Sequence, residues 1–147
     1  MRGLAVLDLP RSRGRRTALI LLSIFFIGAG VSHFLRPDFY LAIVPPYLPA
    51  HRALVAVSGF FEILGGIGVL LPSVRSVAGW GLVALLCAVF PANLHMAMNP
   101  AQFVTMGFSS WALYARLPLQ LVFIAWAYWA TRPAEGSAED KRARPAA

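Results

Sequence analysis

Four apolar runs, each long enough to cross a lipid bilayer, constrain the fold of this chain more than any other feature. They cover about residues 17–35, 53–71, 77–96 and 111–131. A helix needs about 20 apolar residues to span the hydrocarbon core, where its backbone groups must be satisfied internally. The chain is also 59% hydrophobic and only 13% charged, whereas soluble domains average about 25% charged residues. We therefore predict an all-α membrane protein, a four-helix bundle with four transmembrane spans.

The limits of the first and fourth runs follow from their lengths. Arginines precede the first run as in a secretory signal, but the run from Thr17 to Leu35 is longer than the roughly 7 to 15 apolar residues of a signal peptide. We therefore expect a retained helix. In the fourth run, residues 117–130 alone are too short to span. The span must begin near Trp111, which brings Arg116 inside it.

Two connecting segments have unusual compositions. Residues 36–52 contain Pro37, Pro45, Pro46 and Pro49, which forbid one continuous helix. This segment could be an ordinary loop or a lid over the bundle. Residues 97–110 carry no charged side chain and should lie at the membrane interface.

The distribution of basic residues predicts the orientation. The formal net charge of +7 could indicate nucleic acid, but most of the basic side chains lie in tails at 1–16 and 133–147 or in the turn at Arg75. Arg36, Arg52 and Arg116 lie toward the opposite side. The positive-inside rule then predicts that both termini are cytoplasmic, with the lipid bilayer as partner and no nucleic acid. The C-terminal tail, 133–147, should be disordered.

A single carboxylate lies near the centre of the second run, in the stretch SGFFEILGGIGV from Ser58 to Val69. A charge at that depth is unfavourable by roughly 2.5 to 3.5 kcal/mol, so Glu62 needs a partner. Gly59, Gly65 and Gly66 recur at the helical spacing of Glu62, and small residues mark faces where helices approach closely. We predict that these glycines pack against other helices and that Glu62 points into the bundle.

The predicted topology places the intramembrane polar side chains in the outer half of the bilayer. These residues are His33, Glu62, Asn93, His95, Arg116 and Gln120. Because intramembrane charges usually pair, we expect Glu62 to pair with Arg116 at an outward-facing polar cavity. The alternative is a structural pair that only fixes helix register, with wet interfacial histidines and Asn93 satisfying backbone groups freed by Pro91. No residue set has the spacing of a metal site.

The chain from about residue 27 to 132 resembles the DoxX-like family of small four-helix membrane proteins. The matching stretches are GAGVSHFLRPDFY, IVPPYLP, LVAVSGFFEILGGIGVLLP, AVFPANLHMA and ARLPLQLVFIAWAYWATR. The resemblance implies a multi-pass protein of the bacterial cytoplasmic (inner) membrane. It also implies a membrane redox partner, because relatives include a subunit of an archaeal thiosulfate:quinone oxidoreductase and partners of thiol-redox proteins. Cys87 is the only cysteine, so an independent thiol-oxidising role is not expected.

Three functions fit these features. The first, which we favour, is an accessory or binding subunit of a membrane redox system, whose cavity takes a quinone headgroup or another small amphiphilic ligand. It would have no catalytic activity of its own and no firmly assigned cofactor. The second is a small proton-coupled transporter, which the strong charge bias opposes. The third is a ligand-free structural or assembly factor in which Glu62 and Arg116 hold helices together or engage a transmembrane helix of a partner.

Overall fold

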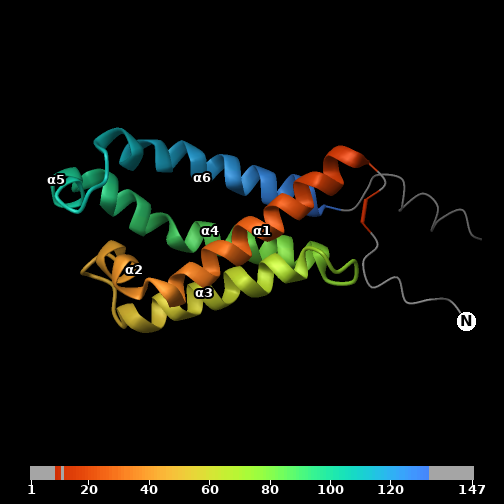
Figure 1. Cartoon of the computed structure of the whole chain (residues 1–147), viewed down its shortest axis with the longest axis horizontal. Helices are drawn as coiled ribbons and strands as arrows, with labels where there is room; N and C mark the ends of the chain where they lie inside the picture. Colours follow the sequence, from red (N-terminus) through yellow and green to blue (C-terminus); the bar gives the residue numbers. More distant parts are fainter. Residues whose placement is uncertain (1–8, 11, 133–147) are drawn as a thin grey trace, which may run out of the picture.

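The computed structural model describes residues 9–10 and 12–132, and the described chain is helical (Figure 1). The prediction of an all-α protein is therefore confirmed. Most of the basic N-terminal tail and the whole predicted C-terminal tail lie outside the described residues. In chain order the helices are α1 (Arg13–Leu35), α2 (Pro37–Ile43), α3 (His51–Gly68), α4 (Arg75–Met98), α5 (Pro100–Val104) and α6 (Ser110–Thr131).

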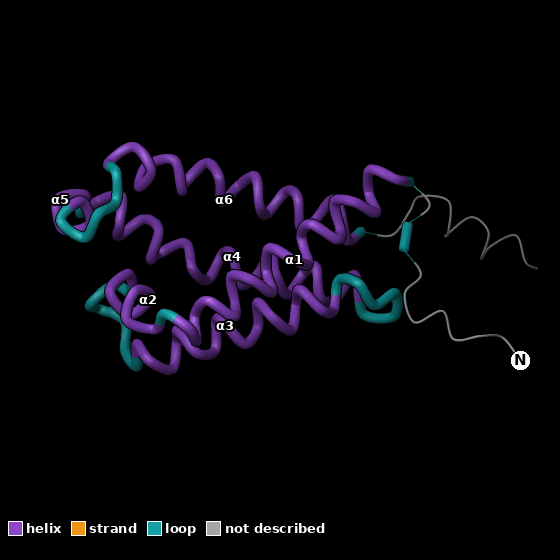
Figure 2. The backbone as a smooth tube through the Cα atoms, viewed as in Figure 1, coloured by secondary structure: helices purple, strands orange, loops and turns teal. Residues whose placement is uncertain are grey.

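The four long helices run up and down in a ring. Helix α1 packs against α3, α3 against α4, α4 against α6, and α6 again against α1. The short helices α2 and α5 lie at one end of the bundle, and the start of α1 and the end of α6 lie at the other (Figure 1). Figure 2 shows that the loops lie at these two ends. The two ends of the described chain are thus on the same side of the bundle.

The long helices match the four predicted apolar runs within a few residues, whereas α2 and α5 were not predicted. Each short helix begins with a proline, Pro37 or Pro100. Proline is well suited to the first position of a helix because its N–H would be unpaired there anyway. A segment rich in proline can therefore still contain a short helix, and, as predicted, no continuous helix covers residues 36–52.

Glycines let α3 approach both of its neighbours. A Cβ on Gly59 would lie 2.7 Å from the Cβ of His33, and a Cβ on Gly30 would lie 2.5 Å from the carbonyl oxygen of Gly59. Gly66 faces the backbone of α1 in the same way, and Gly65 receives the side chain of Leu82 from α4. These contacts fix α1 and α3 against each other at a distance that only glycine allows.

Apolar side chains form a buried cluster at each end of the bundle. Near the chain ends, the cluster includes Leu19, Leu22, Phe26, Val69, Leu82, Ala127 and Ala130. At the opposite end, Ile43, Met96, Phe103 and Leu113 pack together. Large apolar side chains also cover much of the outer surface. By length and composition, α1 and α4 are able to cross a membrane.

Candidate functional site

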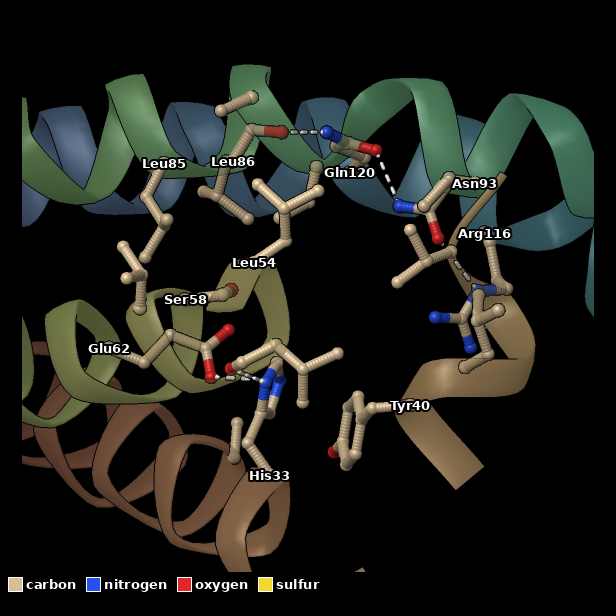
Figure 3. Close-up of a pocket in the computed structure, with 18 of the residues that line it drawn as sticks. His33, Tyr40, Leu54, Ser58, Glu62, Leu85, Leu86, Asn93, Arg116 and Gln120 are labelled. Carbon is tan, nitrogen blue, oxygen red and sulfur yellow. Dashed lines mark hydrogen bonds and ion pairs between the residues drawn. The ribbon is translucent and has the colours of Figure 1, made fainter. Parts of the chain in front are cut away.

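A cavity of about 560 Å³ lies between the two apolar clusters. All four long helices and α2 contribute to its walls, which are mainly aliphatic and phenylalanine side chains. A few polar side chains interrupt these walls, and Figure 3 shows that they form two groups. One group contains His33, Ser58 and Glu62, and the other contains Asn93, Arg116 and Gln120.

In the first group, Glu62 of α3 faces His33 of α1. The Nε2 atom of His33 is 3.3 Å from Oε2 of Glu62, and the Nδ1 atom is 3.0 Å from the carbonyl oxygen of Val55. His33 is only 8% exposed. Although the ion-pair distance is short, its geometry is not that of a hydrogen bond. Oε2 of Glu62 and Oγ of Ser58 are therefore buried without a hydrogen-bond partner among the described residues.

In the second group, a chain of hydrogen bonds links α6 and α4. Nε of Arg116 donates to Oδ1 of Asn93 over 3.0 Å, and Nδ2 of Asn93 donates to Oε1 of Gln120 over 2.7 Å. Nε2 of Gln120 then donates to the carbonyl oxygen of Leu86. The donor of each of these three hydrogen bonds therefore has a defined acceptor, so the amide orientations and the plane of the Arg116 guanidinium are fixed together.

Helix α2 brings an aromatic residue to the His33 side of the cavity. The ring of Tyr40 stacks on His33 with 3.7 Å between centroids, and its hydroxyl group hydrogen-bonds to Oγ of Ser32. Tyr40 lines the cavity together with Ile43, Val44 and Pro45 of the same segment. The first part of the proline-rich segment therefore forms one wall of the cavity.

The predicted ion pair between Glu62 and Arg116 is wrong. Both side chains line the cavity, but Glu62 contacts His33 and Arg116 donates to Asn93. His95 does not line the cavity, and its Nδ1 atom is instead 3.1 Å from Nδ2 of Asn99. The position of each polar residue along its helix predicts its depth, but the rotation of each helix about its axis, which selects the partner, could not be predicted.

Sequence reasoning missed Tyr40 and Ser58 as members of the site. Ser58 lies four residues before Glu62, so the helical repeat already placed both on one face. The signal for Tyr40 was weaker, because an aromatic residue near a membrane interface is common. Within the part of the chain that the structure describes, no three His, Cys, Asp or Glu side chains are grouped to hold a metal ion.

Comparison with known sequences corrects the expected family. A model of the family described as Domain of unknown function (DUF8561) matches residues 22–131. The DoxX-like family gave no match, so the expected membership of that family is wrong. The quoted stretches combine small residues, a carboxylate within an apolar helix and several prolines, and any tightly packed apolar bundle can share these features. Searches of curated proteins and of solved structures found no significant match.

Proposed function

The chain belongs to the DUF8561 family, and because that description assigns no activity, we propose a function from the cavity itself. The protein is an integral membrane protein with four transmembrane helices that binds a small amphiphile inside the bundle. The observation that carries this proposal is an apolar cavity with two buried polar atoms, Oγ of Ser58 and Oε2 of Glu62, that have no hydrogen-bond partner among the described residues.

The surface of the bundle supports a membrane location. In the most apolar stretch of α1 only 28% of the residues are buried, and in that of α4 only 11%. A core helix of a soluble protein would be mostly buried. Helix α3 exposes Phe60, Phe61 and Leu64, and α6 exposes residues such as Leu121 and Val122. Exposed apolar area that extends over several helices is typical of a surface that contacts lipid.

The helices α3 and α6 span as well in this proposal, although only α1 and α4 are long and apolar enough to cross a membrane by length and composition alone. Each carries polar residues that face the cavity, Glu62 in α3 and Arg116 with Gln120 in α6. Polar side chains inside a membrane bundle usually face a cavity and not lipid. Their presence therefore lowers the apolar content of these two helices without exposing polar groups to the bilayer.

The basic residues support an orientation in a cytoplasmic membrane. Arg13, Arg15 and Arg16 begin α1, Arg75 begins α4 and Arg132 follows α6, so all five lie at the end of the bundle that holds the described chain ends. The positive-inside rule places this end in the cytoplasm. The cavity and α2 then lie in the half of the bundle that faces away from the cytoplasm.

The cavity supports binding more directly than any other role. Its volume of about 560 Å³ is within the roughly 300 to 1,000 Å³ of small-molecule sites, which are also mainly apolar with a few convergent polar groups. A quinone headgroup is one such ligand. The redox partner was implied by the resemblance to the DoxX-like family, so our proposal is confined to binding. The ligand-free alternative then depends on contacts of Glu62 and Arg116 with a partner's transmembrane helix, because these two side chains are not paired with each other among the described residues.

Native mass spectrometry of protein extracted into polymer nanodiscs tests the proposal without detergent. We expect the wild type to release a bound amphiphile of defined mass. Ala88→Phe places a ring in the cavity wall and should abolish this signal. Ala84→Phe makes the same change one turn away on α4, at an exposed position outside the cavity, and should keep it. Equal release from both variants, or none from the wild type, would overturn the proposal.

A further inference from the structure

We propose that the ligand of the cavity is a monoanionic amphiphile whose oxyanion headgroup, a carboxylate or a phosphodiester, binds to Arg116. This inference rests on the proposed binding function and adds the charge and the chemical class of the ligand. It follows from the charges that line the cavity and from the hydrogen bonds that each of them makes.

Arg116 has no acidic partner in the described part of the chain. The acidic residues there are Asp38 and Glu62. Asp38 is exposed and does not line the cavity, and Glu62 is paired with His33. The one hydrogen bond of the Arg116 side chain to a described residue uses Nε, with the neutral amide of Asn93 as acceptor. The two Nη groups thus have unused donors at the cavity, as Figure 3 shows.

The His33–Glu62 pair does not balance the charge of Arg116. The carbonyl oxygen of Val55 can only accept, so Nδ1 of His33, 3.0 Å away, carries a proton. Without a further proton, the electron-rich Nε2 of His33 would lie 3.3 Å from a negatively charged carboxylate oxygen of Glu62, and the two atoms would repel even without hydrogen-bond alignment. One proton therefore belongs to this contact, on the imidazole or on the carboxyl group. In both cases the pair is neutral as a whole.

The remaining groups around the cavity leave a net charge of about +1, which is that of Arg116. Tyr40 uses its hydroxyl group with Ser32, and Asn93 and Gln120 are neutral amides. An uncompensated cation in a site of low dielectric is costly, so an anionic ligand gains most from this site.

The fixed orientation of Arg116 favours an oxyanion over other anions. The bonds through Asn93 and Gln120 to the carbonyl group of Leu86 hold the guanidinium plane and leave its Nη edge available. A planar guanidinium edge matches two oxygens of a carboxylate or phosphate group. Phe25, Leu85 and Phe123 supply apolar walls against which a hydrocarbon tail can pack.

A panel of single-chain probes tests the proposal on the whole protein in phosphatidylcholine nanodiscs at neutral pH. Dodecanoate, dodecanamide and dodecylammonium share a tail and differ in headgroup charge, and decylubiquinone represents an uncharged quinone. We expect dodecanoate to bind at least tenfold more tightly than the amide or the quinone, and the ammonium probe most weakly. If phosphatidylglycerol competes tightly with dodecanoate, the natural headgroup is that of a phospholipid. If phosphatidylglycerol does not compete, the natural ligand is a fatty acid.

Variants then assign the preference to one side chain. Arg116→Gln should remove the tenfold preference for dodecanoate, whereas Arg116→Lys should retain part of it because the positive charge remains. Arg52→Gln, an exposed position outside the cavity, should have no effect. If Arg116→Gln keeps the preference, or if dodecanoate does not bind, the inference is overturned. Tight binding of decylubiquinone alone would overturn it and leave the proposed binding function intact.

Discussion

Gly59 and Gly30 set the distance between α1 and α3, and through it the position of His33 beside Glu62. A Cβ atom added to either glycine would clash with the carbonyl oxygen of the other. A methyl group at this crossing would have to push apart two backbones, which cannot move as a flexible side chain does. The glycines therefore contribute to the geometry of the cavity although they do not line it.

Gly59→Ala should lower stability by about 1 to 3 kcal/mol, the usual cost of overpacking. Its matched control is Gly28→Ala on α1, where a Cβ would meet nothing within 4 Å. That change should be neutral or stabilising by up to about 1 kcal/mol, because alanine is the better helix former. Thermal unfolding of both variants in the same nanodiscs measures the difference. Equal midpoints would contradict the close crossing.

The polar residues show how far the sequence could determine the site. The run of apolar residues around Glu62 predicted that this carboxylate faces the bundle, and Glu62 does line the cavity. Its partner could not be predicted, because His33 and Arg116 lie at similar depths on different helices. Only the rotation of α1 and α6 distinguishes them, and that rotation depends on packing of whole helices and not on any one residue.

Helix α2 closes one side of the cavity. It was also the hardest of the cavity-lining helices to predict from the sequence. Tyr40 holds it by two contacts, the ring stack on His33 and the hydrogen bond to Ser32. The four prolines of residues 36–52 predicted that no continuous helix covers this segment, and three of them lie outside α2. Pro37 begins the helix instead, because a proline ends a helix only when it lies in its interior.

Tyr40→Phe should speed ligand release, because it removes the hydrogen bond to Ser32 and keeps the aromatic stack. A net hydrogen bond is worth about 0.5 to 1.5 kcal/mol, which corresponds to a release rate roughly 2 to 10 times faster. Tyr47→Phe is the control, since Tyr47 is 69% exposed and does not line the cavity. Dissociation rates of a cavity ligand from nanodiscs test this expectation. An unchanged rate for Tyr40→Phe would show that α2 does not control release.

At the scale of the whole molecule, the four-helix ring was predictable because length and apolar content decide where a long helix can form. The four long helices lie within a few residues of the predicted runs. The shape of the cavity was not predictable. It is the space left between two separate apolar clusters, and these clusters are built from different sets of helices. The family resemblance failed for a related reason, because a shared apolar pattern specifies a bundle and not a family.

The proposed site of ligand binding depends on a chain that crosses the membrane four times with both described ends in the cytoplasm. In a Cys87→Ser background, single cysteines at Ser12 and Ser109 mark opposite ends of the bundle, before α1 and before α6. Labelling of spheroplasts with a membrane-impermeant maleimide measures their sides directly. We predict that Ser109→Cys reacts in intact spheroplasts and that Ser12→Cys reacts only after lysis. Reaction of both from the same side, or recovery of the protein in the soluble fraction, would contradict the account.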